Sequence, residues 1–274
     1  MEMTRRSWVG VLLVAGLFSV GAIGCQALTR AEASAALEEA GLAAEAEALT
    51  SGSVEIGTRF TIGMAAEDAA MELSSFIESQ LPCAAITVEG ATLSIEYGAN
   101  PGSCTYRGQT YGGVHAITVM RNEMDDVVVS HRWEDLNDDR VTVTGTAMVT
   151  WSFADETRHV VHELTWTRLS DGRSATGSGD RLQRSLEGGI FEGFGVDGTR
   201  AWEGESGTWT LGIDGVEMRW VDPVPQAGTY TLTTPESKTL SLGFSRVDGD
   251  TITVTISSGA RSYDFDVTTL PAEE

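Results

Sequence analysis

From residue 84 to its end, the chain alternates apolar and polar residues with a period of two. The longest run covers residues 141–151, where Val, Gly, Ala and Trp alternate with Thr and Met. This period places successive side chains on opposite faces of a strand, which predicts a sheet with one buried face and one threonine-rich, solvated face. The same alternation returns at residues 127–133, 160–166, 209–213, 216–220, 240–244, 252–256 and 263–267.

The alternating runs are separated by short turn signals. Four Asp-Gly dipeptides favour tight hairpins because both residues tolerate positive φ; they are Asp171-Gly172, Asp197-Gly198, Asp214-Gly215 and Asp248-Gly249. Short connections force neighbouring strands to be antiparallel. We therefore predict a mainly β fold, a long antiparallel meander of roughly ten to thirteen strands that forms a sandwich, a barrel or a curled open sheet.

One or two helices precede this meander. Thr29 and Glu32 have the spacing of a capping box, and the Ala/Glu/Leu-rich run to Leu49 should be a spacer helix loosely docked on the body. A second helix over residues 65–81 has apolar residues at helical spacing and should cover one face of the sheet. Residues 54–62, between the two helices, read more as a strand.

The N-terminus has the pattern of a targeting segment. Arg5 and Arg6 precede an apolar run over residues 8–23, and the chain then reads Gly-Ala-Ile-Gly up to Cys25, which is a lipobox. We expect residues 1–24 to be a signal peptide, Cys25 to carry a lipid within a helical tether over residues 25–50, and residues 51–274 to form a single β-rich domain. The twin arginine leaves export of the folded protein as an alternative.

Two further cysteines, Cys83 and Cys104, form an isolated pair in a chain expected to be exported. They should form a disulfide, which would stabilise the fold by about 3 kcal/mol, mainly by restricting the unfolded ensemble. Two thiols without a Cys-x-x-Cys partner do not make a zinc site.

The chain is strongly acidic, with a net charge of −22 over 274 residues. Such a charge disfavours nucleic acids and anionic headgroups as partners of basic patches. It also favours cations, and the loop around Asp135, Asn137 and Asp139 places oxygen ligands at alternate positions. This loop lacks the glycine and the glutamate of a calcium loop, so a polar hairpin is the alternative to calcium binding, and we assign no other cofactor.

Other motifs indicate structure more than chemistry. The glycines of residues 193–198 match a nucleotide-binding pattern by letter, but a strand follows instead of a helix, so we expect a glycine-rich hairpin. His159 and His162 would point to opposite faces of a strand, His162 inward and His159 outward. His115 and His131 are single histidines on strands. We find no Gly-x-Ser-x-Gly, His-Glu-x-x-His or Ser-x-x-Lys motif and predict no enzyme.

Five tryptophans close or continue apolar strand faces, where they would bury a large area. They are Trp133, Trp151, Trp166, Trp209 and Trp220. Core packing is the expected role, and stacking on sugar rings at an open sheet face is the alternative.

Four stretches carry a resemblance: the lipobox, residues 104–108 (CTYRG), residues 143–146 (VTGT) and residues 197–202 (DGTRAW). With these the chain resembles uncharacterised β-rich lipoproteins of bacterial envelopes. The resemblance implies a location in the envelope and a β-rich architecture, and it implies no activity. Gln26 after the cysteine favours the outer membrane.

We therefore expect a non-enzymatic structural or binding module, held to the membrane through the lipid on Cys25. Its candidate partners are a glycan, an apolar ligand or another envelope protein. The alternative functions are a carrier whose sheet curls around an apolar ligand, with the helix of residues 65–81 as plug or lid, and a hydrolase.

Overall fold

A computed structural model describes residues 27–61, 64–122, 126–152 and 154–268. Cys25 and the expected signal peptide lie outside these residues. Two helices precede the strands: α1 (Arg30–Ile56) and α2 (Ala66–Gln80). The strands are β1 (Ala85–Glu89), β2 (Thr92–Tyr97), β3 (Thr105–Tyr106), β4 (Gln109–Thr110), β5 (Gly112–Arg121), β6 (Val127–Asn137), β7 (Val141–Ser152), β8 (Thr157–Arg168), β9 (Ser174–Leu186), β10 (Gly189–Gly204), β11 (Gly207–Arg219), β12 (Ala227–Thr233), β13 (Thr239–Arg246), β14 (Thr251–Ser258) and β15 (Arg261–Thr268).

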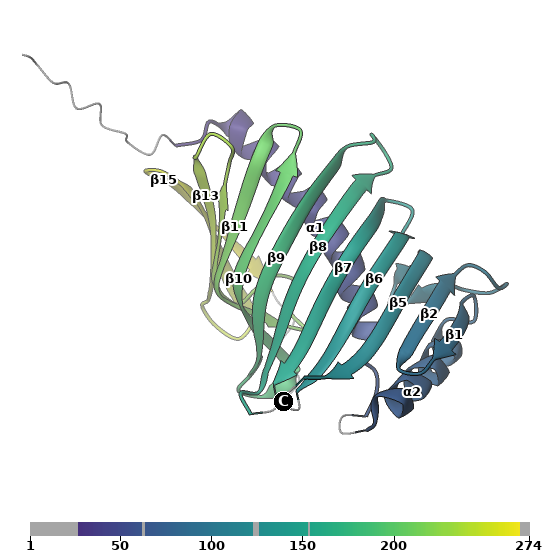
Figure 1. Ribbon diagram of the computed structural model, residues 1–274. Coiled ribbons are helices and arrows are strands. Elements are labelled where there is room, and N and C mark those ends of the chain that lie inside the picture. Colours follow the sequence, from purple (N-terminus) through teal and green to yellow (C-terminus); the bar gives the residue numbers. More distant parts are fainter. Residues whose placement is uncertain (1–26, 62–63, 123–125, 153, 269–274) are drawn as a thin grey trace, which may run out of the picture.

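Thirteen of these strands form one antiparallel sheet (Figure 1). Its spatial order follows the chain from β1 to β15, interrupted only by β3 and β4, which pair with each other as a separate small hairpin. The sheet stays open, with β1 and β15 at its two edges. This confirms the predicted meander and selects the curled open sheet among the three arrangements that the sequence allowed.

Two of the four Asp-Gly pairs do not form turns, which corrects the prediction. Asp197-Gly198 lies inside β10 and Asp214-Gly215 inside β11, and the pairing of these strands shifts register there as a β-bulge. The Gly215 amide donates a hydrogen bond of 2.8 Å to the Asp197 carboxylate across the bulge. Bulges bend a strand and increase its twist, so these residues help to curl the sheet. The expected glycine-rich hairpin over residues 193–198 is likewise a continuous part of β10.

Helix α1 begins as predicted and ends later than predicted. The Thr29 and Glu32 side chains form the reciprocal capping box, with hydrogen bonds of 3.3 and 2.7 Å. The helix continues through Val54 to Ile56, so the strand expected to start at residue 54 is wrong for these residues, and α1 runs through the boundary expected between residues 50 and 51. A buried apolar face at the C-terminal end of the helix overrides the β-branched residues' preference for strands.

The same helix is not loosely docked. It runs across one face of the sheet, and the sheet curls around it (Figure 1). Ala36, Leu42, Ala46 and Leu49 are at most 2% exposed. Small side chains let the helix approach the sheet closely, which is why a thin apolar stripe is enough to bury it.

Helix α2 confirms the second predicted helix. It packs against β1, β2 and β5 through Ala70, Leu73 and Ile77, which are fully buried. It therefore covers the sheet near its β1 edge (Figure 1).

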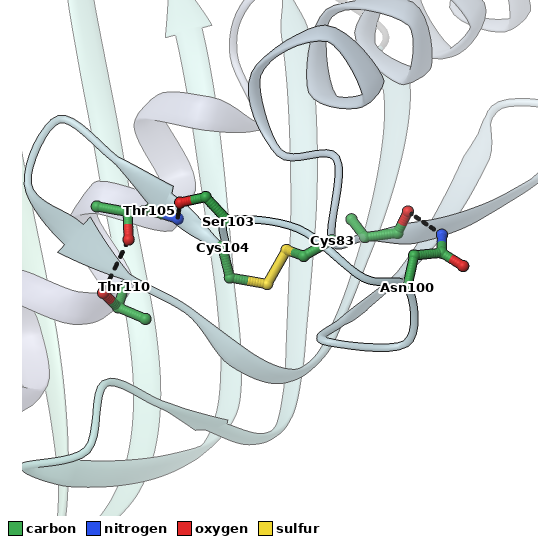
Figure 2. The surroundings of a disulfide bond; sticks show 7 residues. Cys83, Asn100, Ser103, Cys104, Thr105 and Thr110 are labelled. Atoms are coloured by element: carbon green, nitrogen blue, oxygen red, sulfur yellow. Dashed lines mark hydrogen bonds between the residues drawn. A yellow bond between two sulfur atoms is a disulfide. The ribbon is translucent and has the colours of Figure 1, made fainter.

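Cys83 and Cys104 form the predicted disulfide, with their Cα atoms 5.3 Å apart. The bond links the segment after α2 to the segment before β3 (Figure 2). The Asn100 side chain donates a hydrogen bond of 2.9 Å to the Ala84 carbonyl beside it. Together these interactions hold the loop between β2 and β3 against the start of β1.

Candidate functional site

A cavity of about 1020 Å³ lies between α1 and the face of the sheet formed by β6 to β13. Its volume is at the upper end of the range of small-molecule sites. The cavity exists because α1 contacts the sheet along one side and leaves a space on its other side, where the curled strands turn toward it.

On the helix side, the cavity is lined by one row of mostly small side chains. Leu37, Ala40, Ala44, Ala48 and Ser51 recur at helical spacing on this face of α1. Ala44 and Ala48 are exposed where they line the cavity. Alanine at these positions leaves the space that longer side chains would fill.

On the sheet side, the wall is mainly apolar. Val196 and Ile213 line it and belong, with Val216, to a buried apolar cluster separate from the main core; Phe194 and Met218 are partly buried neighbours that also line the cavity. The β11 bulge at residues 214 and 215 allows both Ile213 and Val216 to join this cluster, although an uninterrupted strand would place them on opposite faces. Leu232 and Leu242 extend the wall across β12 and β13.

A buried charge cluster interrupts the apolar wall where α1 crosses β9 and β10. Glu47 of α1 forms ion pairs with both Arg181 of β9 and Arg200 of β10. The three side chains are only 13%, 12% and 9% exposed. Arg200 also donates a hydrogen bond of 3.0 Å to the Ala43 carbonyl. Two guanidinium groups thus share one carboxylate.

A second pair lies nearer the C-terminal end of α1. Arg158 forms an ion pair with Glu55, and its guanidinium lies 4.8 Å from the centre of the Trp151 ring. The arginine is therefore held by a carboxylate and by a cation–π contact. Trp151 is half-buried and lines the cavity beside it.

Burial sets the protonation of the groups around this charge cluster. It lowers the pKa of Arg181 and of Arg200 to about 10, so both stay cationic at neutral pH. Burial, and then the nearby charge of Arg200, lowers the pKa of His162 to about 4, so this imidazole is neutral. Burial raises the pKa of Tyr230 despite both arginines, so its phenol keeps its proton and can donate a hydrogen bond.

A second polar cluster lies inside the main core. His115 Nε2 is 2.9 Å from His131 Nδ1, and the Tyr97 hydroxyl is 3.3 Å from His115 Nδ1. Both imidazoles stack on Trp133, whose indole N–H donates a 2.9 Å hydrogen bond to Ser53 of α1. Burial lowers the pKa of His115 to about 3 and that of His131 well below its usual value. These neutral rings serve packing and hydrogen bonding.

The calcium candidates lie at the hairpin between β6 and β7. Asp135 and Asp139 are exposed with positive φ, and the Asn137 amide donates a 2.9 Å hydrogen bond to the Asp135 carbonyl. The buried carboxylate here is Asp138, which pairs with Arg140 at 2.6 Å. Within the described ranges, no three His, Cys, Asp or Glu side chains gather as a metal site would require. Calcium binding stays a prediction.

The other histidines and tryptophans named from the sequence lie in the buried core, on the exposed surface or in the cavity wall. His162 is buried, and His159 is partly exposed and pairs with Asp180 at 2.6 Å, so the two lie on opposite faces as expected. Trp166 and Trp209 are buried in the core. Trp220 is 56% exposed and lines the cavity, so it departs from the core role expected of it.

Sequence reasoning missed the arginine cluster and the pairing of the two core histidines. A signal for Arg200 was present: it shares strand parity with Trp202, so alternation places a guanidinium on an apolar face. No comparable signal pairs His115 with His131, because sheet register brings them together.

The helix expected as plug or lid is not the one at the cavity. Every cavity-lining residue of a helix belongs to α1, and α2 lies toward the β1 edge of the sheet.

In the part of the chain that the structure describes, neither helix combines the length and apolar character needed to cross a membrane. Comparisons with protein-family models, with curated proteins and with solved structures found no match.

Proposed function

We propose that the protein is a lipid-anchored binding protein of a bacterial cell envelope that carries an apolar ligand between α1 and its curled sheet. The observation that carries this proposal is the cavity of about 1020 Å³, walled mainly by apolar side chains. The lipobox at Cys25 supports an anchor in the outer membrane, and the ligand site would then face the aqueous compartment next to it.

The cavity favours a carrier over a purely structural module. A structural sheet would bury its inner face by direct packing against the helix, as it does beneath Leu42 and Leu49. Here the helix instead presents the exposed alanines Ala44 and Ala48 toward apolar strands. Apolar surface arranged around an open space gains free energy when a ligand removes it from water.

Binding can be tested with the chain from Gln26 onward, which contains every described residue. We expect the neutral apolar dye Nile red to bind with increased fluorescence, and hexadecanol to displace it. Native mass spectrometry of the same protein would show the bound alcohol as added mass that is lost on denaturation.

The variant Ala44→Phe should weaken the binding of hexadecanol by about tenfold. The phenyl ring would displace at least two methylene groups of the ligand, each contributing about 0.8 kcal/mol. Ala35→Phe is the matched control, because Ala35 is exposed on the same helix but does not line the cavity. Failure of the wild-type protein to bind either probe, or equal weakening by both substitutions, would refute the proposed site.

A further inference from the structure

The cavity wall carries an excess of positive charge inside a strongly acidic protein. Its described charged side chains are four arginines and three glutamates, whereas the whole chain has a net charge of −22. The excess is concentrated in the buried cluster, where Arg181 and Arg200 share the single carboxylate of Glu47. Arg158 has its own partner in Glu55.

The buried cluster of Glu47, Arg181 and Arg200 has more hydrogen-bond donors than Glu47 can accept. A guanidinium has five N–H donors, and the Nε atom of Arg181 is buried without a partner among the described residues. Tyr230 of β12 lines the same cavity, and its protonated hydroxyl adds another donor there. All three side chains line the cavity.

A buried charge is costly unless it is paired, and a low-dielectric surrounding strengthens any pairing that forms. The apolar cavity wall over β10 to β13 provides this low-dielectric environment next to the charge cluster. One negative charge on the ligand, together with the carboxylate of Glu47, would balance the positive charges of Arg181 and Arg200. A neutral ligand would leave the excess uncompensated, and a cationic one would add to it.

Building on the proposed function, we propose that the ligand is an anionic amphiphile. Its hydrocarbon chain would lie along the apolar wall of β10 to β13. Its carboxylate or phosphate would bind Arg181 and Arg200 beside Tyr230. The acidic exterior would repel such a ligand, so its selection depends on this internal cluster.

Four probes built on an unbranched chain of sixteen carbon atoms test the headgroup. Palmitate and hexadecyl phosphate are anionic, hexadecanol is neutral and hexadecyltrimethylammonium is cationic. Displacement of Nile red from the chain starting at Gln26, with each probe below its micelle-forming concentration, gives four comparable affinities. We expect both anions to bind at least about tenfold more tightly than hexadecanol, as one charge-assisted hydrogen-bonded pair implies. The stronger of the two anions identifies a fatty acid or a phospholipid as the source of the headgroup.

Two substitutions should move the anion affinity in opposite directions. Arg181→Gln leaves Arg200 balanced by Glu47 and should weaken anion binding by about tenfold, while hexadecanol binds as before. Glu47→Gln leaves two unbalanced arginines and should tighten anion binding. Arg132→Gln is the control, because Arg132 is exposed on β6, pairs with Glu134 and does not line the cavity.

The outcomes separate this inference from the proposed function. Equal affinities for all four probes, or a preference for the cation, would overturn the anionic ligand and leave an apolar carrier. No displacement by any probe would overturn both. An Arg181→Gln variant that binds hexadecanol normally is folded, so an unchanged anion affinity in that variant would also overturn the role of the cluster.

Discussion

Three of the four histidines of the chain are buried and held neutral. His115 and His131 lie in the main core, and His162 lies in the cavity wall. Desolvation is the largest cause of the lowered pKa of each, and in His131 and His162 a neighbouring positive charge or imidazole adds to it. These imidazoles therefore resist protonation in the folded protein at a pH where the unfolded chain accepts protons.

This arrangement predicts a loss of stability in mild acid. Well above pH 6.5 the buried histidines are neutral in both states and the stability is at its full value. As the pH falls from 6.5 toward 4, the unfolded chain binds protons that the folded protein does not, so the free energy of unfolding should fall by up to about 1.4 kcal/mol per pH unit for each histidine. Urea unfolding midpoints at pH 7.5 and pH 5 measure this fall.

The variant His115→Gln should show a smaller fall over the same interval, whatever its stability at pH 7.5. His159→Gln is the control, because His159 is partly exposed, and it should keep most of the wild-type fall. Hydrogen bonds from basic side chains lower the pKa of Glu32 and of Asp171 to about 2. These two carboxylates therefore lose their contribution to stability only at a more acidic pH than this interval. A flat stability between pH 7.5 and pH 5 would contradict this prediction.

Among the elements, α1 is held on the sheet by ion pairs along its whole length. Five of its six glutamates pair with basic residues of the sheet or its connections. These pairs extend from Glu32, 2.5 Å from Lys238, to Glu55 beside Arg158 near the end of the helix. An acidic helix is thus positioned on a sheet that supplies arginines at matching points, while its alanines set the distance between the two.

Close packing on one side of α1 and open space on the other predict opposite responses to the same substitution. Ala43 is 1% exposed against the sheet, so Ala43→Leu should overpack this contact and lower the free energy of unfolding by about 1–3 kcal/mol. Ala48→Leu extends into the cavity and should change stability by less than about 0.5 kcal/mol. Chemical unfolding of both variants measures the difference. Equal losses would mean that the helix has no open side.

At the scale of the whole molecule, nearly all sheet contacts join strands that follow one another in the chain. Contacts of α1 are the long-range ones: Ser53 bonds Trp133, Glu32 pairs with Lys238, and the Leu28 amide just before the helix donates to Ser258 at 2.9 Å. The helix therefore links strands from β6 to β14. The cavity depends on the same links, because it exists only while α1 stays docked.

A ligand in this cavity should stabilise the entire fold. Binding to the folded state alone raises the free energy of unfolding by about 2.7 kcal/mol when the free ligand is at 100 times its Kd. For a chain of this size we expect hexadecanol or palmitate to raise the melting temperature by roughly 5–10 °C. The Ala44→Phe variant at the same ligand concentration should show a smaller rise. An unchanged wild-type melting temperature at saturation would contradict binding that requires the folded cavity.

Local patterns predicted the parts of the fold that depend on local physics. Strand alternation predicted the meander, the capping box predicted the start of α1, and the two isolated cysteines predicted the disulfide. Asp197-Gly198 and Asp214-Gly215 were misread as turns, because an Asp-Gly pair supplies the backbone freedom of a hairpin and of a β-bulge alike. Only the register of the neighbouring strands decides between the two.

The candidate site depended on tertiary structure for the same reason. The sequence by itself determined an acidic chain with alternating strands and small residues along the first helix, and it carries the residue pattern of a lipobox before that helix. The tertiary structure decided which face of α1 meets the sheet, that a cavity stays open beside it, and that Glu47, Arg181 and Arg200 meet in its wall. Charges more than 130 residues apart come together only when the sheet has curled around the helix, and no local pattern encodes that curvature.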